Sequence, residues 1–532
     1  MANPNSPFFP IIYVRGYAMT GGEIDDTTAD PFCGFNLGST VYRAVPDIKS
    51  PPRKYIFESP VLRLGSDFGY GDVYEDGYDI LDPEWSADPD NKLGSRSIII
   101  YRYYDEASHL LGSGKTPSIK TFSAGLGDLI LKVRDLVCAN PKNGVSPEDF
   151  RCYLVAHSMG GLVCRGLLQN PANDPAGARR YVDKLFTYAT PHNGIDVAGV
   201  NVPAWLGQWD MNNFNRDQMA EYLDLKPSYK KSGQVNWLPE DRFPSSRVFC
   251  MVGTNRADYA VALGLSRTFA GHGSDGLVRI ENATLKGLRP DGSPGEPCAK
   301  AFAYRSHSGH FGIVNSEEAY QNLTRFLFGD VRVDIWVDVE EIRLPKEVQQ
   351  AAEAGTAVNA LYQFEVLASP RGKPWYLTRR TAEEDSVACM SHQEWVADPR
   401  KNGQQYVSTV FLANRAKVNP RRRSLSYAMT LGVRVPDYEV DRKLWLDKHY
   451  EGGYLFRDAI VLELVPPRTD QEPWKVSYVW QSQNKGSADQ VVEAVTLGGG
   501  KIEVRIPFAS LSTPGIRGSL RFVVQPWNDE SK

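Results

Sequence analysis

One short stretch, Cys152–Arg165, combines a potentially reactive side chain with a backbone that could present it. Its apolar residues Tyr153–Ala156 predict a buried strand, and Met159–Gly161 begin a segment that predicts a helix ending near Leu168. A one-residue turn between strand and helix would strain Ser158 and lift its hydroxyl clear of the backbone. The free N–H groups at the helix start would face any oxyanion formed at this point. The stretch therefore predicts a nucleophilic serine; the alternative is a serine in an unreactive strand-to-helix loop.

Residues 156–160 read Ala-His-Ser-Met-Gly. This sequence resembles the nucleophile turn of lipases and esterases in the α/β-hydrolase superfamily, including small bacterial lipases and the GPI inositol-deacylase-like group. The usual pattern is Gly-x-Ser-x-Gly, and alanine stands here in place of the first glycine. The resemblance implies a mostly parallel sheet with helices on both faces. It also implies a triad of serine, acid and histidine in that chain order.

A second motif follows the first predicted strand, residues 8–14. Hydrolases of this type usually have His-Gly there, and this chain has Arg15-Gly16-Tyr17. The resemblance implies that the backbone N–H groups of Tyr17 and Met159 form the oxyanion hole. Because these donors are main-chain groups, Arg15 should not abolish the hole, but it brings an unusual charge close to it. The alternative is that these three residues form an ordinary turn.

The acid and the base of the triad are expected further along the chain. Asp275 lies in Asp-Gly-Leu-Val, which resembles the acid-bearing loop of lipases, and Asp196 is the second candidate for the acid. Two histidines, His307 and His310, lie between the last predicted strand and a predicted helix over 316–328. An apolar run directly follows His310, as in the histidine loop of small bacterial lipases. We therefore predict His310 as the base, with His307 as the alternative.

The first 330 residues predict an α/β domain, because predicted strands, such as Ser97–Tyr104 and the apolar run after Lys184, alternate with predicted helices, such as Phe122–Val137. A chain of 532 residues is too long for one core, so at least one further domain is expected. Residues 195–245 interrupt the alternation and are rich in aromatic side chains. In lipase-like hydrolases an insertion at this place often covers the active site, so we expect a cap or lid that receives an acyl chain. A helix that simply packs on the sheet is the alternative.

The pattern changes after residue 330. Apolar and polar residues alternate strictly over Val331–Val339, which predicts a strand with one buried face. One helix is predicted, over Lys346–Ala354. Six more strand-like runs are Leu361–Leu367, Val407–Leu412, Ala459–Val465, Lys475–Trp480, Ile502–Pro507 and Leu520–Val524. Residues 331–532 therefore predict an all-β, sandwich-like domain, whose role could be to bind a surface, a partner or the catalytic domain.

Composition excludes several classes of partner. The net charge of −4 gives no reason to expect a nucleic-acid surface. The seven cysteines are odd in number and widely spaced, so neither a disulfide framework nor a metal site is predicted. We find no signal peptide and no stretch long enough to span a membrane, which leads us to expect a cytoplasmic protein. Export by a route without a cleaved signal stays open.

These observations together predict a serine ester hydrolase of the lipase or esterase type. The expected substrate is an acyl ester or lipid-like molecule, and no metal or organic cofactor is expected. Acyl transfer to an alcohol would use the same residues. A non-catalytic binding or scaffold protein with a degenerate hydrolase fold is the alternative from another class.

Overall fold

The computed structural model describes residues 6–16, 35, 39–43, 53–57, 59–73, 80, 85, 92–109, 117–197, 200–201, 213–256, 273–309, 312–417, 419, 421–440, 448–465, 472, 474–483 and 490–528. The chain divides into two compact units, Met1–Lys300 with Arg305–Phe328, and Gly329–Lys532 with Ala301–Tyr304. The main division, after Phe328, falls two residues before the boundary that we predicted from the change of pattern.

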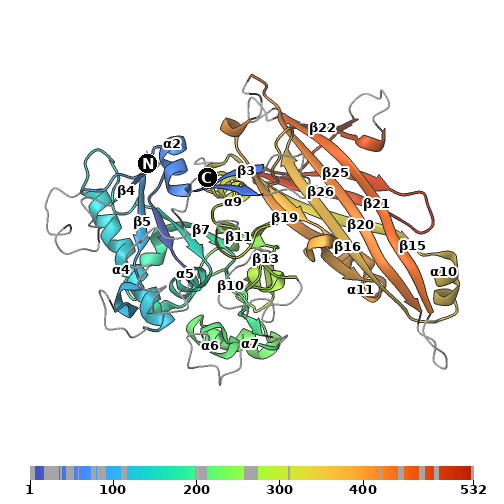
Figure 1. The fold of residues 1–532 in the computed structure, drawn as a ribbon, viewed down its shortest axis with the longest axis horizontal. Helices are drawn as coiled ribbons and strands as arrows, with labels where there is room; N and C mark the ends of the chain where they lie inside the picture. Colours follow the sequence, from blue (N-terminus) through green and yellow to red (C-terminus); the bar gives the residue numbers. More distant parts are fainter. Residues whose placement is uncertain are drawn as a thin grey trace. The chain divides into compact units, whose positions relative to one another are not determined.

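The first unit is built on a seven-stranded sheet of order β14-β11-β7-β6-β1-β5-β4 (Figure 1). Its strands are β1 (Ile11–Val14), β4 (Gly71–Asp72), β5 (Ser97–Tyr101), β6 (Cys152–His157), β7 (Val182–Tyr188), β11 (Val248–Gly253) and β14 (Ala299–Ala303). The pairs β4–β5, β5–β1, β1–β6, β6–β7 and β7–β11 are all parallel. Strand β6 lies at the centre and is buried over its first five residues, as expected for a parallel sheet covered on both faces.

Helices cover both faces of this sheet. The main ones are α2 (Pro60–Phe68), α4 (Ile119–Cys138), α5 (Met159–Gln169) and α9 (Glu317–Phe328). Leu154 of β6 belongs to one apolar cluster with side chains of α4 and α5. On the other face, the ring of Phe326 in α9 contacts the rings of Phe186 and Phe249, which belong to β7 and β11. The first unit is thus an α/β domain of the predicted class.

Capping residues explain two of the helix starts. The Ser118 hydroxyl accepts from the Thr121 N–H at 3.2 Å, so α4 begins three residues before the predicted start at Phe122. The Ser316 hydroxyl accepts from the Ala319 N–H at 3.2 Å at the start of α9, as predicted. Further short elements are the strand pairs β2 (Ser39–Arg43) with β3 (Arg53–Phe57) and β8 (Asp196–Val197) with β9 (Val200–Asn201), and the three strands β10 (Trp237–Pro239), β12 (Lys286–Leu288) and β13 (Pro294–Pro297).

Of the segment expected to cap the active site, residues 195–245, the structure describes 195–197, 200–201 and 213–245. The last of these stretches contains α6 (Arg216–Tyr222) and α7 (Lys226–Ser232). Its apolar side chains Phe214, Met219 and Tyr222 are buried in the domain core, so this part packs on the domain instead of presenting apolar groups to a substrate. Trp205, Trp209 and Met211 lie outside the described residues. A cap formed by the earlier part of 195–245 stays a prediction.

The second unit consists of two antiparallel sheets. One has the order β19-β15-β26-β25-β24, and the other β17-β16-β20-β21-β22-β23, with β18 beside β16. The strands are β15 (Val331–Arg343), β16 (Val358–Pro370), β17 (Thr378–Arg380), β18 (Ala388–Ser391), β19 (Gln404–Leu412), β20 (Leu425–Val440), β21 (Lys448–Val465), β22 (Lys475–Trp480), β23 (Gln490–Val492), β24 (Val495–Gly498), β25 (Lys501–Ala509) and β26 (Gly515–Pro526). The predicted helix is α10 (Lys346–Glu353), and α11 (His392–Ala397) and α12 (Pro399–Asn402) are additional.

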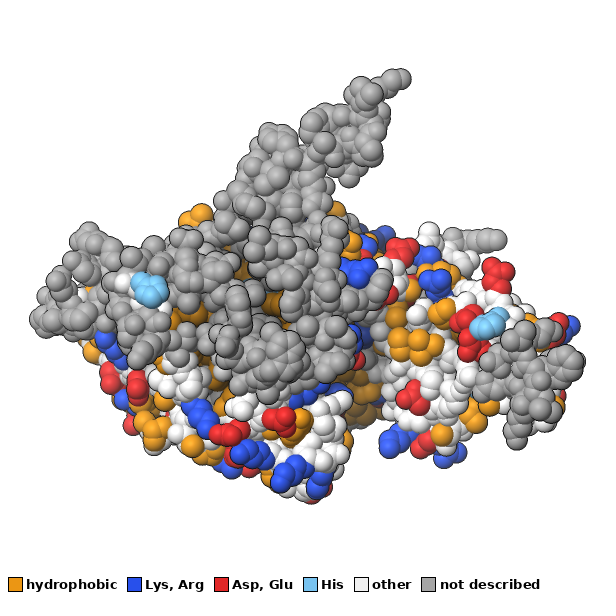
Figure 2. Space-filling model, turned by 60° about the horizontal axis from the view of Figure 1, so that its bottom comes forward, with side chains coloured by type: hydrophobic (Ala, Val, Ile, Leu, Met, Phe, Trp, Pro, Cys, Tyr) orange, Lys and Arg blue, Asp and Glu red, His pale blue; other side chains and the backbone are white. Residues whose placement is uncertain are grey.

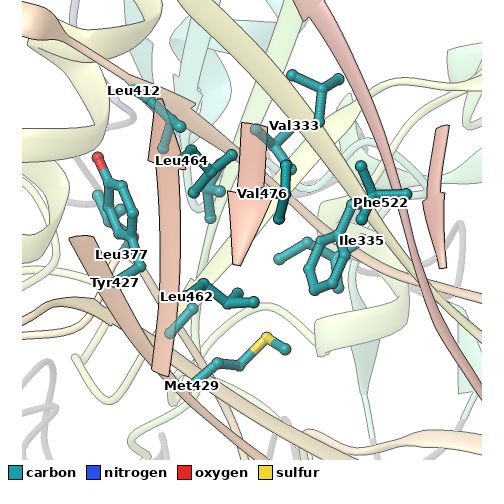
Figure 3. A pocket seen from close by; sticks show the side chains of 14 residues that line it. Val333, Ile335, Leu377, Leu412, Tyr427, Met429, Leu462, Leu464, Val476 and Phe522 are labelled. Atoms are coloured by element: carbon teal, nitrogen blue, oxygen red, sulfur yellow. The ribbon is translucent and has the colours of Figure 1, made fainter. Parts of the chain in front are cut away.

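Side chains of both sheets share one apolar core in the second unit. The alternate residues Val331, Val333, Ile335, Val337 and Val339 of β15 are all buried, which confirms the period-two prediction. Figure 3 shows Leu464 and Val476 of one sheet lying opposite Ile335 and Phe522 of the other, around a small space lined only by apolar residues and one tyrosine. The unit is therefore a β-sandwich-like domain.

The described surface gives little sign of segregated charge. In the view of Figure 2, Lys and Arg side chains are interspersed with Asp and Glu side chains over the described part. The described cysteines, six in number, are all free thiols. Within the described ranges, no helix combines the length and apolar character that a membrane crossing requires.

Candidate active site

Ser158 occupies the turn between β6 and α5 and has a strained backbone. Its φ of 51° and ψ of −125° lie in a region that non-glycine residues rarely adopt, at a cost of about 1–3 kcal/mol. The Ser158 N–H donates to the Tyr188 carbonyl at 2.9 Å, which ties the turn to β7. A side chain at Gly160 would place its Cβ 2.2 Å from the Val14 carbonyl oxygen, so only glycine allows β1 to approach the turn this closely. Local sequence and neighbouring strands together hold the serine in this conformation.

The imidazole of His307 lies between Ser158 and Asp275. Its Nε2 is 3.0 Å from the Ser158 hydroxyl oxygen, and its Nδ1 is 2.9 Å from Asp275 Oδ2. All three residues are at most 4% exposed. Because an ionised carboxylate only accepts hydrogen bonds, Nδ1 carries the proton, and Nε2 is left to accept from the serine hydroxyl. This arrangement can move a proton from Ser158 to His307 while Asp275 stabilises the resulting positive charge.

Main-chain groups hold Asp275 in place. Its Oδ1 accepts from the N–H groups of Leu277 at 3.0 Å and Val278 at 2.8 Å, which leaves Oδ2 to face His307. The Asp275 carbonyl accepts from the His307 N–H at 3.0 Å, so acid and histidine are joined through the backbone as well. The Asp-Gly-Leu-Val sequence thus fixes the carboxylate by an Asx-type turn, in which the N–H groups two and three residues further on are its partners.

The loop after β14 contains both histidine candidates, His307 and His310. His307 makes the contacts expected of the base, and His310 lies outside the described residues. The loop closes after His307, because the Ile313 N–H donates to the Ser306 carbonyl at 2.9 Å. Ile313 and Val314, the apolar residues that favoured His310 in the sequence, are buried and anchor this loop. These two residues are therefore as compatible with His307 as the base as with His310.

The loop expected to supply the oxyanion hole is held by Tyr103. The Tyr103 hydroxyl donates to the Arg15 carbonyl at 2.7 Å and lies 3.2 Å from the Gly16 carbonyl oxygen. Burial raises the pKa of Tyr103 well above its usual range, so this hydroxyl keeps its proton at neutral pH. Met159 begins α5, where helix N–H groups have no acceptor within the helix. Tyr17, the other expected donor, lies outside the described residues.

Removing the Tyr103 hydroxyl is expected to slow turnover without unfolding the domain. In Tyr103→Phe the loop at Arg15 and Gly16 loses the contact that positions it, and we expect kcat for a short ester to fall about 10-fold, the equivalent of one hydrogen bond of about 1.4 kcal/mol. The matched control is Tyr181→Phe. Tyr181 directly precedes β7, at the opposite end of the parallel strands from Ser158, and its hydroxyl is bonded to Arg134. Equal turnover in Tyr103→Phe and wild type would remove Tyr103 from the site.

His157 is a further functional candidate that the sequence did not single out. Its Nε2 lies 2.9 Å from the His307 carbonyl oxygen, and the centres of the two imidazole rings are 5.0 Å apart. Burial, and then the neighbouring His307, lower the pKa of His157 to about 3, so it is neutral near pH 7 and donates from Nε2. His157 therefore holds the backbone of His307 close to Ser158. Its position beside the serine was the only clue in the sequence.

Two other candidates have structural partners. His192, which its place after β7 could suggest as a base, is fully buried, and its Nε2 lies 3.1 Å from the Thr187 hydroxyl oxygen. Asp196, the second candidate for the acid, accepts from Arg216 at 2.9 Å and from Asn282 at 2.8 Å. These contacts use both of its carboxylate oxygens, whereas Asp275 is the carboxylate that contacts His307.

Arg165 joins α5 to the segments around it. This fully buried side chain donates to the carbonyl groups of His192 at 2.8 Å, Val235 at 2.8 Å and Trp237 at 2.9 Å. These bonds satisfy a guanidinium that would otherwise be costly to bury. Arg165 therefore fixes the segment after α7 to the helix that begins beside Ser158.

A possible metal-binding group lies in the second unit. Among the described residues, Asp437, Glu439 and His449 are near enough to one another to share an ion. They are at least two-fifths exposed, and His449 Nδ1 lies 3.3 Å from Glu439 Oε1 and 3.7 Å from Asp437 Oδ2. None of them belongs to the cluster around Ser158.

Comparisons with known proteins add only distant likenesses. No protein-family model and no curated protein matches the chain. A structure of the mature lipase BlEst2 from Bacillus licheniformis is 15% identical, with 61% of this chain and 94% of that chain covered and a TM-score of 0.29. The lin2722 product from Listeria innocua is 11% identical, with 60% and 93% covered and a TM-score of 0.24. Phospholipase PlaB from Legionella pneumophila, in complex with thio-NAD, is 13% identical, with 83% and 89% covered and a TM-score of 0.30.

The fold is evident from the first unit itself. Its central strand β6 leads through a strained serine into α5, between parallel neighbours and under helices on both faces. Acid and histidine follow the serine in the chain order that α/β-hydrolases have. The first unit of the chain therefore has the α/β-hydrolase fold, followed by a β-sandwich-like domain.

Proposed function

We propose that the chain is a serine ester hydrolase that uses Ser158, His307 and Asp275. The single observation that carries the proposal is the His307 imidazole, which is hydrogen-bonded to the Ser158 hydroxyl on one side and to Asp275 on the other. In this role His307 replaces His310, our preference from the sequence.

The reaction proceeds through an acyl-enzyme. His307 Nε2 takes the proton of the Ser158 hydroxyl while the serine oxygen bonds to the acyl carbonyl carbon. The carbonyl oxygen becomes an oxyanion, which the N–H groups of Met159 and Tyr17 stabilise by about 3 kcal/mol per donor. When this intermediate collapses, the ester C–O bond breaks and His307 returns the proton to the leaving alcohol. Water then attacks the carbonyl carbon of the acyl-enzyme while His307 takes a proton from the water. When this second intermediate collapses, the bond to the Ser158 oxygen breaks, His307 returns the proton to the serine, and the acid is released.

Asp275 keeps the imidazole in the productive tautomer. With Oδ1 occupied by two backbone N–H groups, Oδ2 accepts the Nδ1 proton and stabilises the imidazolium that forms in each step. His157 and Tyr103 contribute by positioning: one holds the His307 backbone and the other the loop at Arg15 and Gly16.

The test is an active-site probe combined with a panel of esters. A fluorophosphonate should label the folded protein at Ser158, as identified by peptide mass spectrometry, and heat-unfolded protein should not react. p-Nitrophenyl esters of increasing chain length should be hydrolysed by the same preparation, and their order of kcat/KM would give the acyl preference. Absence of both labelling and hydrolysis would favour a non-catalytic protein with a degenerate hydrolase fold.

A further inference from the structure

Arg15 stands where hydrolases of the resembling type usually have histidine, and its neighbour Gly16 packs against the proposed catalytic serine. It follows β1 directly and precedes Gly16. A Cβ added at Gly16 would lie 2.9 Å from Ser158 Cβ and 2.9 Å from His157 Nδ1. The backbone at Arg15 and Gly16 therefore packs directly on the turn that carries Ser158, where the acyl ester must bind.

One nitrogen of the Arg15 guanidinium is buried without a hydrogen-bond partner. This atom, Nη1, is shielded from solvent and makes no hydrogen bond to any residue that the structure describes. No carboxylate within the described ranges forms an ion pair with it. The positive charge of Arg15 lowers the pKa of His157, after the larger effects of burial and of His307. It also lowers the pKa of Tyr103 against the larger effect of burial, so the guanidinium is close to both rings.

A hydrogen-bond acceptor placed at Nη1 would stabilise this arrangement. A buried donor without an acceptor costs about 1–3 kcal/mol, and more when it carries charge. Among the described residues, His157 and Tyr103 interact with Arg15 and do not offset its charge, because His157 is neutral near pH 7 and Tyr103 keeps its proton. The oxyanion of the reaction exists only transiently and has main-chain donors of its own. A planar guanidinium suits a phosphate group, which it can bind through two parallel N–H···O bonds.

We propose that Arg15 is a specificity-determining residue that binds the phosphodiester of a glycerophospholipid whose acyl ester is presented to Ser158. In such a lipid the phosphate and the acyl esters are carried by the same three-carbon glycerol unit. A cation one residue from the glycine that backs Ser158 can therefore reach the phosphate while the ester carbonyl lies at the serine. This inference rests on the proposed ester hydrolase function and adds to it the class of substrate.

The experiment compares two soluble substrates that differ in the phosphate. One is dihexanoyl-glycerophosphocholine below its aggregation concentration, and the other is neutral dihexanoylglycerol. In Arg15→Gln, the ratio of kcat/KM for the phospholipid to kcat/KM for the diacylglycerol should fall about 10- to 100-fold, the effect of losing one or two charge-assisted hydrogen bonds. Arg15→Lys keeps the charge but not the two-pronged geometry, so its ratio should lie between those of Arg15→Gln and wild type. The matched control is Arg289→Gln, in the exposed turn between β12 and β13.

Inhibition of the wild-type enzyme gives a second arm that needs no variant. Hexyl phosphate should inhibit hydrolysis of the neutral ester at least about 10-fold more strongly than hexanol, because only the phosphate can engage Arg15. If kcat/KM falls equally for both substrates in Arg15→Gln, or does not change for either, the ratio stays at the wild-type value, and the phosphate role is overturned. Equal inhibition by hexyl phosphate and hexanol would overturn it as well, even if the variants do not fold.

The proposed function fails separately from this inference. A wild-type protein that hydrolyses neither substrate and is not labelled by a fluorophosphonate would refute the hydrolase itself. A wild-type protein that hydrolyses dihexanoylglycerol but prefers it over the phospholipid would leave the hydrolase intact and refute only the phosphate site.

Discussion

Replacing Ser158 by alanine is expected to lower ester turnover by a factor of about 10⁴ or more. The hydroxyl that His307 contacts at 3.0 Å is the atom that would form the acyl-enzyme, and alanine has nothing that can replace it. The remaining oxyanion donors can still stabilise attack by water to a small extent, so a low residual rate above the uncatalysed reaction is expected. The measurement is the initial rate of hydrolysis of a short p-nitrophenyl ester by purified protein.

The control for this substitution is Ser66→Ala on the exposed side of α2. It removes a hydroxyl of the same kind, and its turnover should equal that of wild type. Circular dichroism should show the same thermal midpoint for Ser158→Ala as for wild type to within a few degrees, since the methyl side chain fits where the serine was. A Ser158→Ala variant that keeps a tenth of wild-type turnover would rule out the proposed nucleophile.

The fold of the first unit could be predicted because its evidence is local. The strand, turn and helix around Ser158 need only a short apolar run, a serine and two glycines in sequence. The amphipathic period of α4 and the strands β5 and β7 were visible for the same reason. The capping hydroxyl of Ser118, which sets the true start of α4, lies outside the apolar pattern and was missed.

The second unit was predicted in class but not in all its elements. Strand β15 has uninterrupted valine and isoleucine on one face over Val331–Val339, and this part was predicted; its continuation to Arg343 was not. Strand β20 is longer, but Gly432 and Pro436 interrupt it, and it was missed. Its buried face is nevertheless continuous from Leu425 to Val435, because cross-strand pairing with β16 and β21 holds the chain extended despite these residues. Pairing partners distant in sequence decide such a strand, and a window of local sequence does not contain them.

The site was predictable to different depths for different residues. Asp275 sits in a turn that the N–H groups of Leu277 and Val278 complete, so the sequence next to Asp275 contains most of what positions it. Tyr103 and His157 reach their partners across 88 and 150 residues, and nothing near either of them in the sequence indicates those contacts. The choice between His307 and His310 depends on where the loop after β14 closes. The apolar residues used to decide it, Ile313 and Val314, anchor the loop without selecting which imidazole faces the serine.

The two histidines can be separated by the effect of alanine at each. His307→Ala removes the group that accepts the Ser158 proton and also leaves Asp275 without its partner, so turnover should fall to about the level of Ser158→Ala, a loss of about 10⁴ or more. His310→Ala is the matched control from the same loop and should keep most of the wild-type turnover.

A double variant sharpens the argument. Residues that act as one unit are not additive in catalysis, so Ser158→Ala with His307→Ala should be no slower than either single variant. A base acting independently of the serine would instead make the double variant slower than both. Thermal midpoints of all variants show whether a loss arises from unfolding. If His310→Ala is inactive while His307→Ala is folded and keeps its turnover, the base is His310. The hydrogen bond between His307 and Ser158 then has a structural role only.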